Sequence, residues 1–150
     1  VGPSVKIGYL PQIIEFTEPN SSLLEYFKNE VGVDEERARR ILASFDFYKD
    51  EVSKKVKNLS GGERIRVKLA ILLQQQINTL IFDEPTNHID IPTKEVLEEV
   101  LSNFGGTLIF VSHDRYFINK FADKIFEFSS GKVTTYHGNY DYYKSQKNKK

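Results

Sequence analysis

The sequence contains neither cysteine nor methionine among its 150 residues. Without cysteine the chain has no disulfide scaffold and no cysteine-ligated metal site, and such a composition fits a reducing compartment. We therefore expect a cytoplasmic protein. Because the chain begins at Val1 and has no initiator residue, we also expect it to be part of a longer protein.

The sequence also lacks an excess of charge of either sign and any long apolar run. The 21 basic residues balance 21 acidic ones, so no overall field draws the chain toward nucleic acid or an acidic membrane, and any such contact has to be local. No apolar run approaches the roughly 18 residues of a membrane-spanning helix, and no targeting segment opens the chain. The length suits about one domain or a piece of a larger one. We expect a soluble chain with no membrane partner.

Short apolar segments alternate with helical patterns. Strands are predicted at residues 5–10, at residues 79–82 and within residues 105–114. This alternation predicts an α/β fold with a parallel sheet covered on both faces, and ligands bound beyond the carboxyl ends of the strands. Four polar residues follow predicted strands at such ends: Gln12, Asp83, Glu84 and His113.

The helical patterns occupy most of the remaining sequence. Residues 13–58 form a predicted helical block, whose apolar faces contain Leu23, Leu24 and Phe27, then Ala38, Ile41, Leu42 and Phe45. Apolar positions 65, 69, 72 and 73 form one stripe of a further helix. Another helix begins near Pro92, with Val96, Leu97, Val100, Leu101 and Phe104 on one face. Two strands around a turn at residues 129–131 predict a C-terminal hairpin, and residues 140–150 form a polar, lysine-rich tail.

The stretch NLSGGE, residues 58–63, has two interpretations. Ser60 and Glu63 match a capping box, in which each side chain bonds a free amide at the helix start. Capping does not require Gly61 and Gly62, each of which costs about 1 kcal/mol in a helix relative to alanine. Two glycines allow a close approach by another molecule, and the helix terminus favours an anion. The residues alone leave both interpretations open.

The residues at the strand ends also allow ordinary roles. Asp83 and Glu84 can be a solvated turn or a helix cap, or Asp83 can hold Mg²⁺ while Glu84 orients or deprotonates a water. His113 can be a structural histidine with a hydrogen bond, or it can contact a terminal phosphate. The residue types alone do not distinguish between these roles.

In order and spacing, the stretches LPQ, NLSGGE, TLIFDEPTNHID and VSHDRYF together resemble an ATP-binding cassette (ABC) domain over nearly the whole chain. The resemblance implies a P-loop NTPase-type fold that binds ATP and Mg²⁺ and hydrolyses ATP. It further implies one role for each matching residue. Gln12 would be the Q-loop contact to Mg²⁺ and water, Asp83 a Mg²⁺ ligand, Glu84 the catalytic base, Asp90 the D-loop residue and His113 the contact to the γ-phosphate. Residues 59–63, with Ser60, Gly61, Gly62 and Glu63, match the signature motif, which would bind ATP held by a second ABC domain in a head-to-tail pair.

A finer resemblance is to the ABC-F subfamily, whose members have two ABC domains and act on ribosomes as translation factors or antibiotic-resistance factors. It rests on DEPTNHID, SHDRYF and the closing YHGNYDYYKSQK. The glutamate that ends LSGGE and the short connection from Gln12 resemble the second of the two domains. Residues 13–58 would be the helical subdomain and residues 59–139 the part from the signature to the last strands. Lysines 144, 147, 149 and 150 can touch RNA phosphates, or they can be a solvated terminus.

The sequence departs from the family pattern because it has no P-loop, G-x-x-x-x-G-K-[ST], to hold the β- and γ-phosphates. The family places that motif upstream of the Q-loop, so we expect an incomplete ABC fold that cannot hydrolyse ATP alone. A missing inner strand would leave an apolar slot, and self-association of the chain is then expected. Two alternatives to an ABC-F protein stay open, the ATPase subunit of a membrane transporter and a scaffold module without catalysis.

Overall fold

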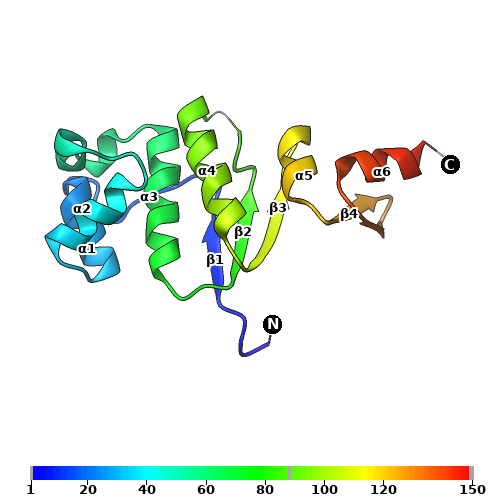
Figure 1. Cartoon of the computed structure of the whole chain (residues 1–150), viewed down its shortest axis with the longest axis horizontal. Helices are drawn as coiled ribbons and strands as arrows, with labels where there is room; N and C mark the ends of the chain where they lie inside the picture. Colours follow the sequence, from blue (N-terminus) through cyan, green and yellow to red (C-terminus); the bar gives the residue numbers. More distant parts are fainter. Residues whose placement is uncertain (1, 88, 149–150) are drawn as a thin grey trace. The chain divides into compact units, whose positions relative to one another are not determined.

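The structure is a computed structural model that describes residues 2–87 and 89–148. The chain divides into two compact units, of which the first runs to Phe110 and the second begins at Val111. Figure 1 labels most of the helices and strands of both units. Lys149 and Lys150, two of the four tail lysines considered for RNA contact, lie outside the described residues.

The first unit contains a three-stranded sheet with the order β1-β2-β3. Its strands are β1 (Ile7–Leu10), β2 (Thr79–Asp83) and β3 (Thr107–Val111), whose last residue is the first of the second unit, and they lie close to the three predicted segments. β1 and β2 pair in parallel, and the register sets Leu10 opposite Phe82. Because parallel neighbours point the same way, their carboxyl ends meet at one edge of the sheet. The prediction of an α/β fold with parallel strands is confirmed.

Helix α3 (Gly61–Gln74) precedes β2, and α4 (Ile91–Asn103) connects β2 to β3. α3 packs on the face of the sheet that buries Leu10, Leu80 and Phe82. Gly8 lies on this face, where an added Cβ would be 2.7 Å from the Cδ1 atom of Ile77. The alternate positions of β1 remain open to solvent, with Ile7 44% and Tyr9 50% exposed. Within the described residues β1 is therefore covered on one face and not on both, and self-association through such a surface stays a prediction.

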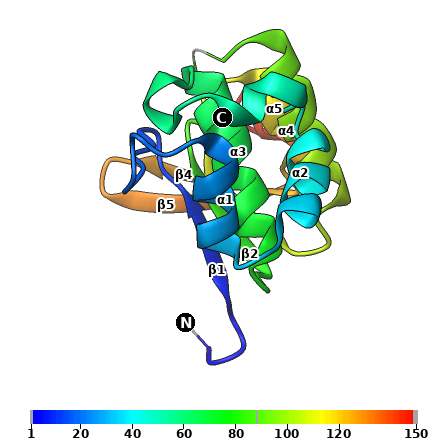
Figure 2. The ribbon, with the colours of Figure 1, turned by 90° about the vertical axis from the view of Figure 1, so that its left-hand side faces the viewer.

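The predicted helical block consists of α1 (Leu23–Val31), α2 (Glu35–Ala43) and the short 3-10 helices η1 (Lys49–Ser53) and η2 (Val56–Asn58). Ser22 caps α1 by accepting a hydrogen bond from the Glu25 amide, and Asp34 caps α2 in the same way. Gly32 ends α1 in the left-handed conformation that favours glycine. In the turned view, α1 and α2 lie beside α3 (Figure 2), and the faces that meet contain Phe27 and Leu42.

The predicted apolar stripe of α3 is partly wrong. Ile65 and Leu73 are only half-buried, whereas the helix buries seven residues around most of its circumference: Gly62, Arg66, Val67, Leu69, Ala70, Ile71 and Leu72. The reason is that α3 contacts β1, α1, α2 and α4. A helix at the centre of a unit has no single solvent face, so a one-stripe pattern does not describe it.

Arg66 fixes the helical block to α3. Its guanidinium is buried and donates hydrogen bonds to the backbone carbonyls of Phe45, at 3.1 Å, and Asp46, at 3.3 Å. It also lies over the Phe47 ring, 4.7 Å from the ring centroid. All these partners belong to the segment that follows α2, so Arg66 holds the end of α2 against α3.

The second unit contains α5 (Arg115–Phe121), the antiparallel strands β4 (Lys124–Ser129) and β5 (Lys132–His137), and α6 (Tyr140–Lys147). The hairpin and its turn are confirmed. The polar tail forms a helix, which the sequence analysis did not predict. Asn139 caps α6, and the hydroxyl of Tyr143 donates to Glu127 on β4 at 3.0 Å. Among the tail lysines, Lys147 is bound to Glu127.

We expect Arg66→Met to lower the free energy of unfolding by about 2 to 4 kcal/mol, because the carbonyls of buried Phe45 and half-buried Asp46 lose their donor. The matched control is Arg40→Met, since Arg40 is 72% exposed in a surface ion pair and its loss costs less than about 1 kcal/mol. Urea unfolding followed by circular dichroism measures both. Equal losses in the two variants would contradict the role of Arg66.

Candidate functional site

One pocket of the first unit brings together residues from three predicted motifs. Gln12, Gly61, Asp83 and Glu84 all line it, and its volume is about 530 Å³. The remaining lining residues are mostly apolar: Leu10, Pro11, Ile13, Ile14, Arg64, Ile65, Pro85, Asn87 and Ile89. We name this cavity the Q-loop pocket. An apolar cavity with a few convergent polar groups is the usual form of a ligand site.

The parallel pairing of β1 and β2 explains why Gln12 and Asp83 meet. Leu10, the last residue of β1, is opposite Phe82, and Asp83 follows at the end of β2. Pro11 stops β1 because proline has no amide hydrogen for a ladder bond. Gln12 and Asp83 thus leave their strands at the same edge, and both side chains are exposed there.

Glu84 has an unusual backbone conformation. Its φ is +50°, in the left-handed region that a residue with a side chain rarely adopts. The Asn87 amide donates to the Glu84 carbonyl at 3.2 Å, so the chain turns immediately after the strand. Such a conformation costs on the order of 1 to 3 kcal/mol and occurs often at functional sites. The turn keeps the half-buried Glu84 in the lining of the Q-loop pocket.

The start of α3 contains the predicted capping box. Ser60 Oγ accepts a hydrogen bond from the Glu63 amide at 3.2 Å, and Glu63 Oε2 accepts one from the Ser60 amide at 2.6 Å. Lys54, which follows η1, donates to Glu63 Oε1 at 2.6 Å. Burial alone would raise the pKa of Glu63, but the hydrogen bonds from Lys54 and Ser60 outweigh it and the pKa is lowered. Both oxygens of Glu63 therefore have partners inside the chain.

The two glycines of the signature have different surroundings. A Cβ added to Gly62 would lie 2.5 Å from Thr93 Oγ1 and 3.3 Å from Asp90 Oδ1, so the packing of α3 against the start of α4 requires this glycine. A Cβ added to Gly61 would meet nothing within 4 Å. Gly61 is exposed and lines the Q-loop pocket, so no contact inside the described chain requires it to be a glycine.

Asp90 begins α4 as its N-cap. Its carboxylate accepts a hydrogen bond from the Thr93 amide at 2.9 Å. The side chain and then the backbone of Thr93 lower the pKa of Asp90 through hydrogen bonds, which keeps the carboxylate charged. Asp90 is placed beside Gly62, so two predicted motifs, the D-loop and the signature, touch each other.

His113 belongs to the second unit. It is exposed and stands one residue before Asp114, the N-cap of α5, whose carboxylate accepts a hydrogen bond from the Phe117 amide at 3.1 Å. Its predicted contact with a phosphate stays a prediction.

Two residues near the site were not found from the sequence. Lys54 is the partner of Glu63, and Arg64 lines the Q-loop pocket. No sequence signal could have found Lys54, because lysine is common and its partner is set by packing. Arg64 directly follows the signature, and only that position could have drawn attention to it.

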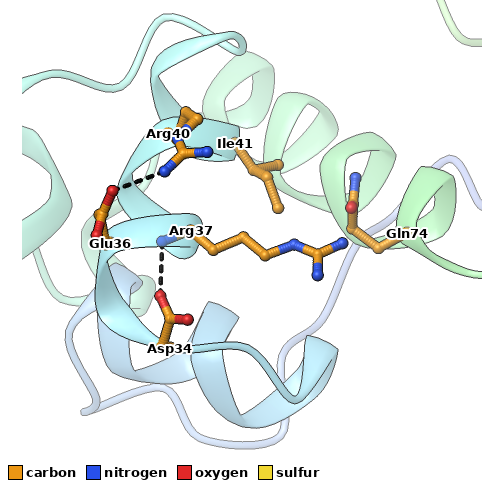
Figure 3. A pocket seen from close by; sticks show the side chains of 6 residues that line it. All are labelled: Asp34, Glu36, Arg37, Arg40, Ile41 and Gln74. Atoms are coloured by element: carbon orange, nitrogen blue, oxygen red, sulfur yellow. Dashed lines mark hydrogen bonds and ion pairs between the residues drawn. The ribbon is translucent and has the colours of Figure 1, made fainter.

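A second pocket, of about 460 Å³, lies between α2 and the end of α3 (Figure 3). Most of its charged groups are already bound: Asp34 caps α2, and Glu36 pairs with Arg40 at 2.7 Å. The side chain of Arg37 extends toward Gln74 across the pocket. None of the predicted site residues lines it.

The oxygen donors of the Q-loop pocket suit Mg²⁺ in one particular way. In the described part of the chain, no group of three or more histidine, cysteine or acidic side chains could hold a metal ion. Mg²⁺ is commonly held by one or two carboxylates together with substrate phosphates and water. Asp83, with Gln12 nearby, fits that arrangement and does not form a metal cage.

No helix among the described residues is long and apolar enough to cross a membrane.

Known proteins have sequences and folds similar to those of this chain. A family model described as ABC transporter matches residues 3–87. The putative ATP-binding protein YdiF of Bacillus subtilis (strain 168) is 47% identical over 97% of this chain and 23% of its own length. The ribosome protection protein VmlR of the same organism is 39% identical over 80% of this chain and 22% of its own length. The chain thus spans less than a quarter of either relative.

A solved structure shares the fold. It is the ATP-binding cassette MJ0796, described as a dimer in a post-hydrolysis state bound to ADP and Pi. It superposes with a TM-score of 0.69 at 23% identity, covering 89% of this chain and 63% of that one. The predicted ABC-type fold is confirmed by this similarity. From the family match over residues 3–87, we conclude that the chain belongs to the ABC transporter family, and its fold is that of an ABC ATPase domain.

Proposed function

We propose that the chain works as part of an ABC-F protein that hydrolyses ATP and acts on ribosomes in the cytoplasm. The observation that carries the proposal is the Q-loop pocket, which combines Gln12, Asp83, Glu84 and Gly61 at one sheet edge. The ribosomal part is supported by the stretches DEPTNHID and YHGNYDYYKSQK and by the similarity to a relative named as a ribosome protection protein. Translation and antibiotic resistance are the two settings that this proposal allows.

The chemistry of the pocket follows from its residues. Bound Mg²⁺ would neutralise phosphate charge and polarise the phosphorus–oxygen bonds. Asp83 would hold the ion and Gln12 would contact it or its water. Glu84 would accept the proton of the attacking water, and the turn at its positive φ keeps the side chain at the pocket. His113 would contact the γ-phosphate.

The signature surface would serve a nucleotide held by another domain. Gly61 is exposed and has no neighbour that a side chain would meet, so backbone amides at the helix start can approach a phosphate closely. Ser60 and Glu63 already bond each other, so they hold this helix start in shape. Asp90 would support the same surface through its contact with Gly62. The partner is a second ABC domain arranged head to tail.

The 150 residues contain no P-loop motif, so the phosphate cradle of a working site has to come from other residues. We expect this chain alone to bind Mg-ATP too weakly for isothermal titration calorimetry to detect at micromolar concentrations and to show no hydrolysis above background. A micromolar dissociation constant for the isolated chain would contradict this expectation. The control is an ABC-F protein that contains both this chain and a P-loop, which is expected to bind under the same conditions.

In the longer protein we expect Glu84→Gln to lower the kcat of ATP hydrolysis on the order of 10² to 10⁴ while ATP binding persists, because the amide cannot accept the proton. Glu95→Gln is the matched control, since Glu95 lies exposed on α4 outside the pocket. Steady-state hydrolysis and nucleotide titration separate the two effects. Unchanged kcat in Glu84→Gln would show that Glu84 is not the catalytic base.

The two glycines give a second test in the longer protein. Gly62→Ala is expected to destabilise the fold by about 1 to 3 kcal/mol, because its Cβ has no room beside Thr93. Gly61→Ala is expected to leave stability equal or slightly higher, since alanine favours helices, yet to lower kcat about tenfold or more by displacing the nucleotide. Thermal unfolding and hydrolysis rates are the measurements. Full activity in Gly61→Ala would show that no phosphate approaches this position.

A further inference from the structure

Arg64 connects the segment after Gln12 to the segment before Ser60. Its three guanidinium nitrogens donate to three backbone carbonyls: Nε to Leu59 at 3.1 Å, Nη1 to Ile14 at 3.2 Å and Nη2 to Lys57 at 3.1 Å. The guanidinium also lies over the Phe16 ring, 5.7 Å from the ring centroid. Every nitrogen of the side chain is therefore used, and two segments about 45 residues apart are held by one planar group.

The same two segments are paired further from the pocket by backbone hydrogen bonds. The Val56 amide donates to Ser21 at 3.0 Å, and the Lys57 amide donates to Pro19 at 2.9 Å. Nearer the pocket the pairing ends. In the described part of the chain, no hydrogen bond other than that of Arg64 to Ile14 joins residues 12–16 to residues 57–64. Arg64 is thus the polar link at the end where Gln12 and the signature lie.

The contacts of Arg64 differ in kind from those of Arg66. Arg66 is buried, and both its acceptors belong to the single segment after α2. Arg64 is half-buried, lines the Q-loop pocket and bonds carbonyls of two segments, that of Ile14 after Gln12 and that of Leu59 before Ser60. A residue that only fastens one element does not need acceptors on two. Because the acceptors are backbone carbonyls, Arg64 responds to the position of the main chain two residues after Gln12.

We propose that Arg64 is a positioning residue that transmits displacement of the Gln12 segment to the signature. A shift of residues 12–14 moves the Ile14 carbonyl, and the planar guanidinium of Arg64 moves with it because the two are hydrogen-bonded. The bond from Arg64 to Leu59 then moves the residue that precedes the Ser60 cap. ATP at the Q-loop pocket would thereby adjust the signature surface that this chain offers to ATP held by the second ABC domain. The role toward ATP rests on the proposed function, whereas the mechanical link between the two segments is a property of the chain alone.

The mechanical link is tested without nucleotide, by amide hydrogen exchange in this chain. Ile14→Ala loosens the first segment and is expected to speed exchange at the amides of residues 59–63. In an Arg64→Gln background the same change is expected to add nothing there, because the link is already broken. Exchange at Leu97 in α4 reports global loosening, and Arg40→Gln is the matched control background. Additive effects of Ile14→Ala and Arg64→Gln would overturn the link.

The role in catalysis is tested in the longer protein by a double-mutant cycle. Gln12→Ala and Arg64→Gln are each expected to lower kcat about 10- to 100-fold with the KM for ATP little changed, and the double variant to lose no more than the larger single loss. Multiplied losses, or a rise in KM without loss of kcat, would overturn the role of Arg64. If Gln12→Ala is fully active, the proposed function fails, and the exchange experiment still decides the mechanical link.

A folding defect in Arg64→Gln would not leave the question open. Arg64→Lys keeps the charge and the aliphatic stem but replaces the planar fork by a single ammonium group, which cannot hold carbonyls on both segments in the same geometry. It is expected to unfold in urea close to the original chain and to lose the coupling in both experiments. Full coupling in Arg64→Lys would contradict the geometric role.

Discussion

The parallel pairing of β1 and β2 is the constraint on which the site depends. It sets Leu10 opposite Phe82, so the chain leaves both strands at the same edge of the sheet. Gln12 and Asp83 are about 70 residues apart in sequence, yet this register makes them neighbours in one pocket. The turn at Glu84 then keeps the next carboxylate at the same edge. Without this register, the three side chains would not line one pocket.

The second part of the site is the start of α3, where local and distant contacts combine. The capping box between Ser60 and Glu63 satisfies amides within one helical turn, and Lys54 adds a charge from the helical block. Capping and phosphate binding, the two interpretations of this stretch, are compatible. The cap shapes the helix start, Gly62 lets α4 approach, and Gly61 leaves the outer surface open.

Two arginines of α3 hold the helical block in different ways. Arg66 gives it a fixed attachment, because its buried guanidinium satisfies carbonyls that would otherwise have no donor. Arg64 lines the Q-loop pocket and bonds both the segment after Gln12 and the segment before Ser60. The helical block is thus anchored at one place, while its connection to the site passes through a half-buried side chain.

The sequence by itself determined the features that depend on neighbours in the chain. Each of these features is set within a few residues, so the sequence predicts it directly. They are the strand ends at Pro11 and Pro85, the cap formed by Ser60 and Glu63, and the hairpin turn near Gly131. The motifs also identified the family. The tertiary structure alone decided the burial of α3 on several sides, the reason for Gly62 and the partners of Lys54, Arg64 and Arg66. Arg64 and Ile14 are 50 residues apart, and such pairs form only when packing brings distant segments together. The physical reason is that a cap or a turn depends on a few dihedral angles, whereas a contact between distant segments depends on the whole arrangement of the core.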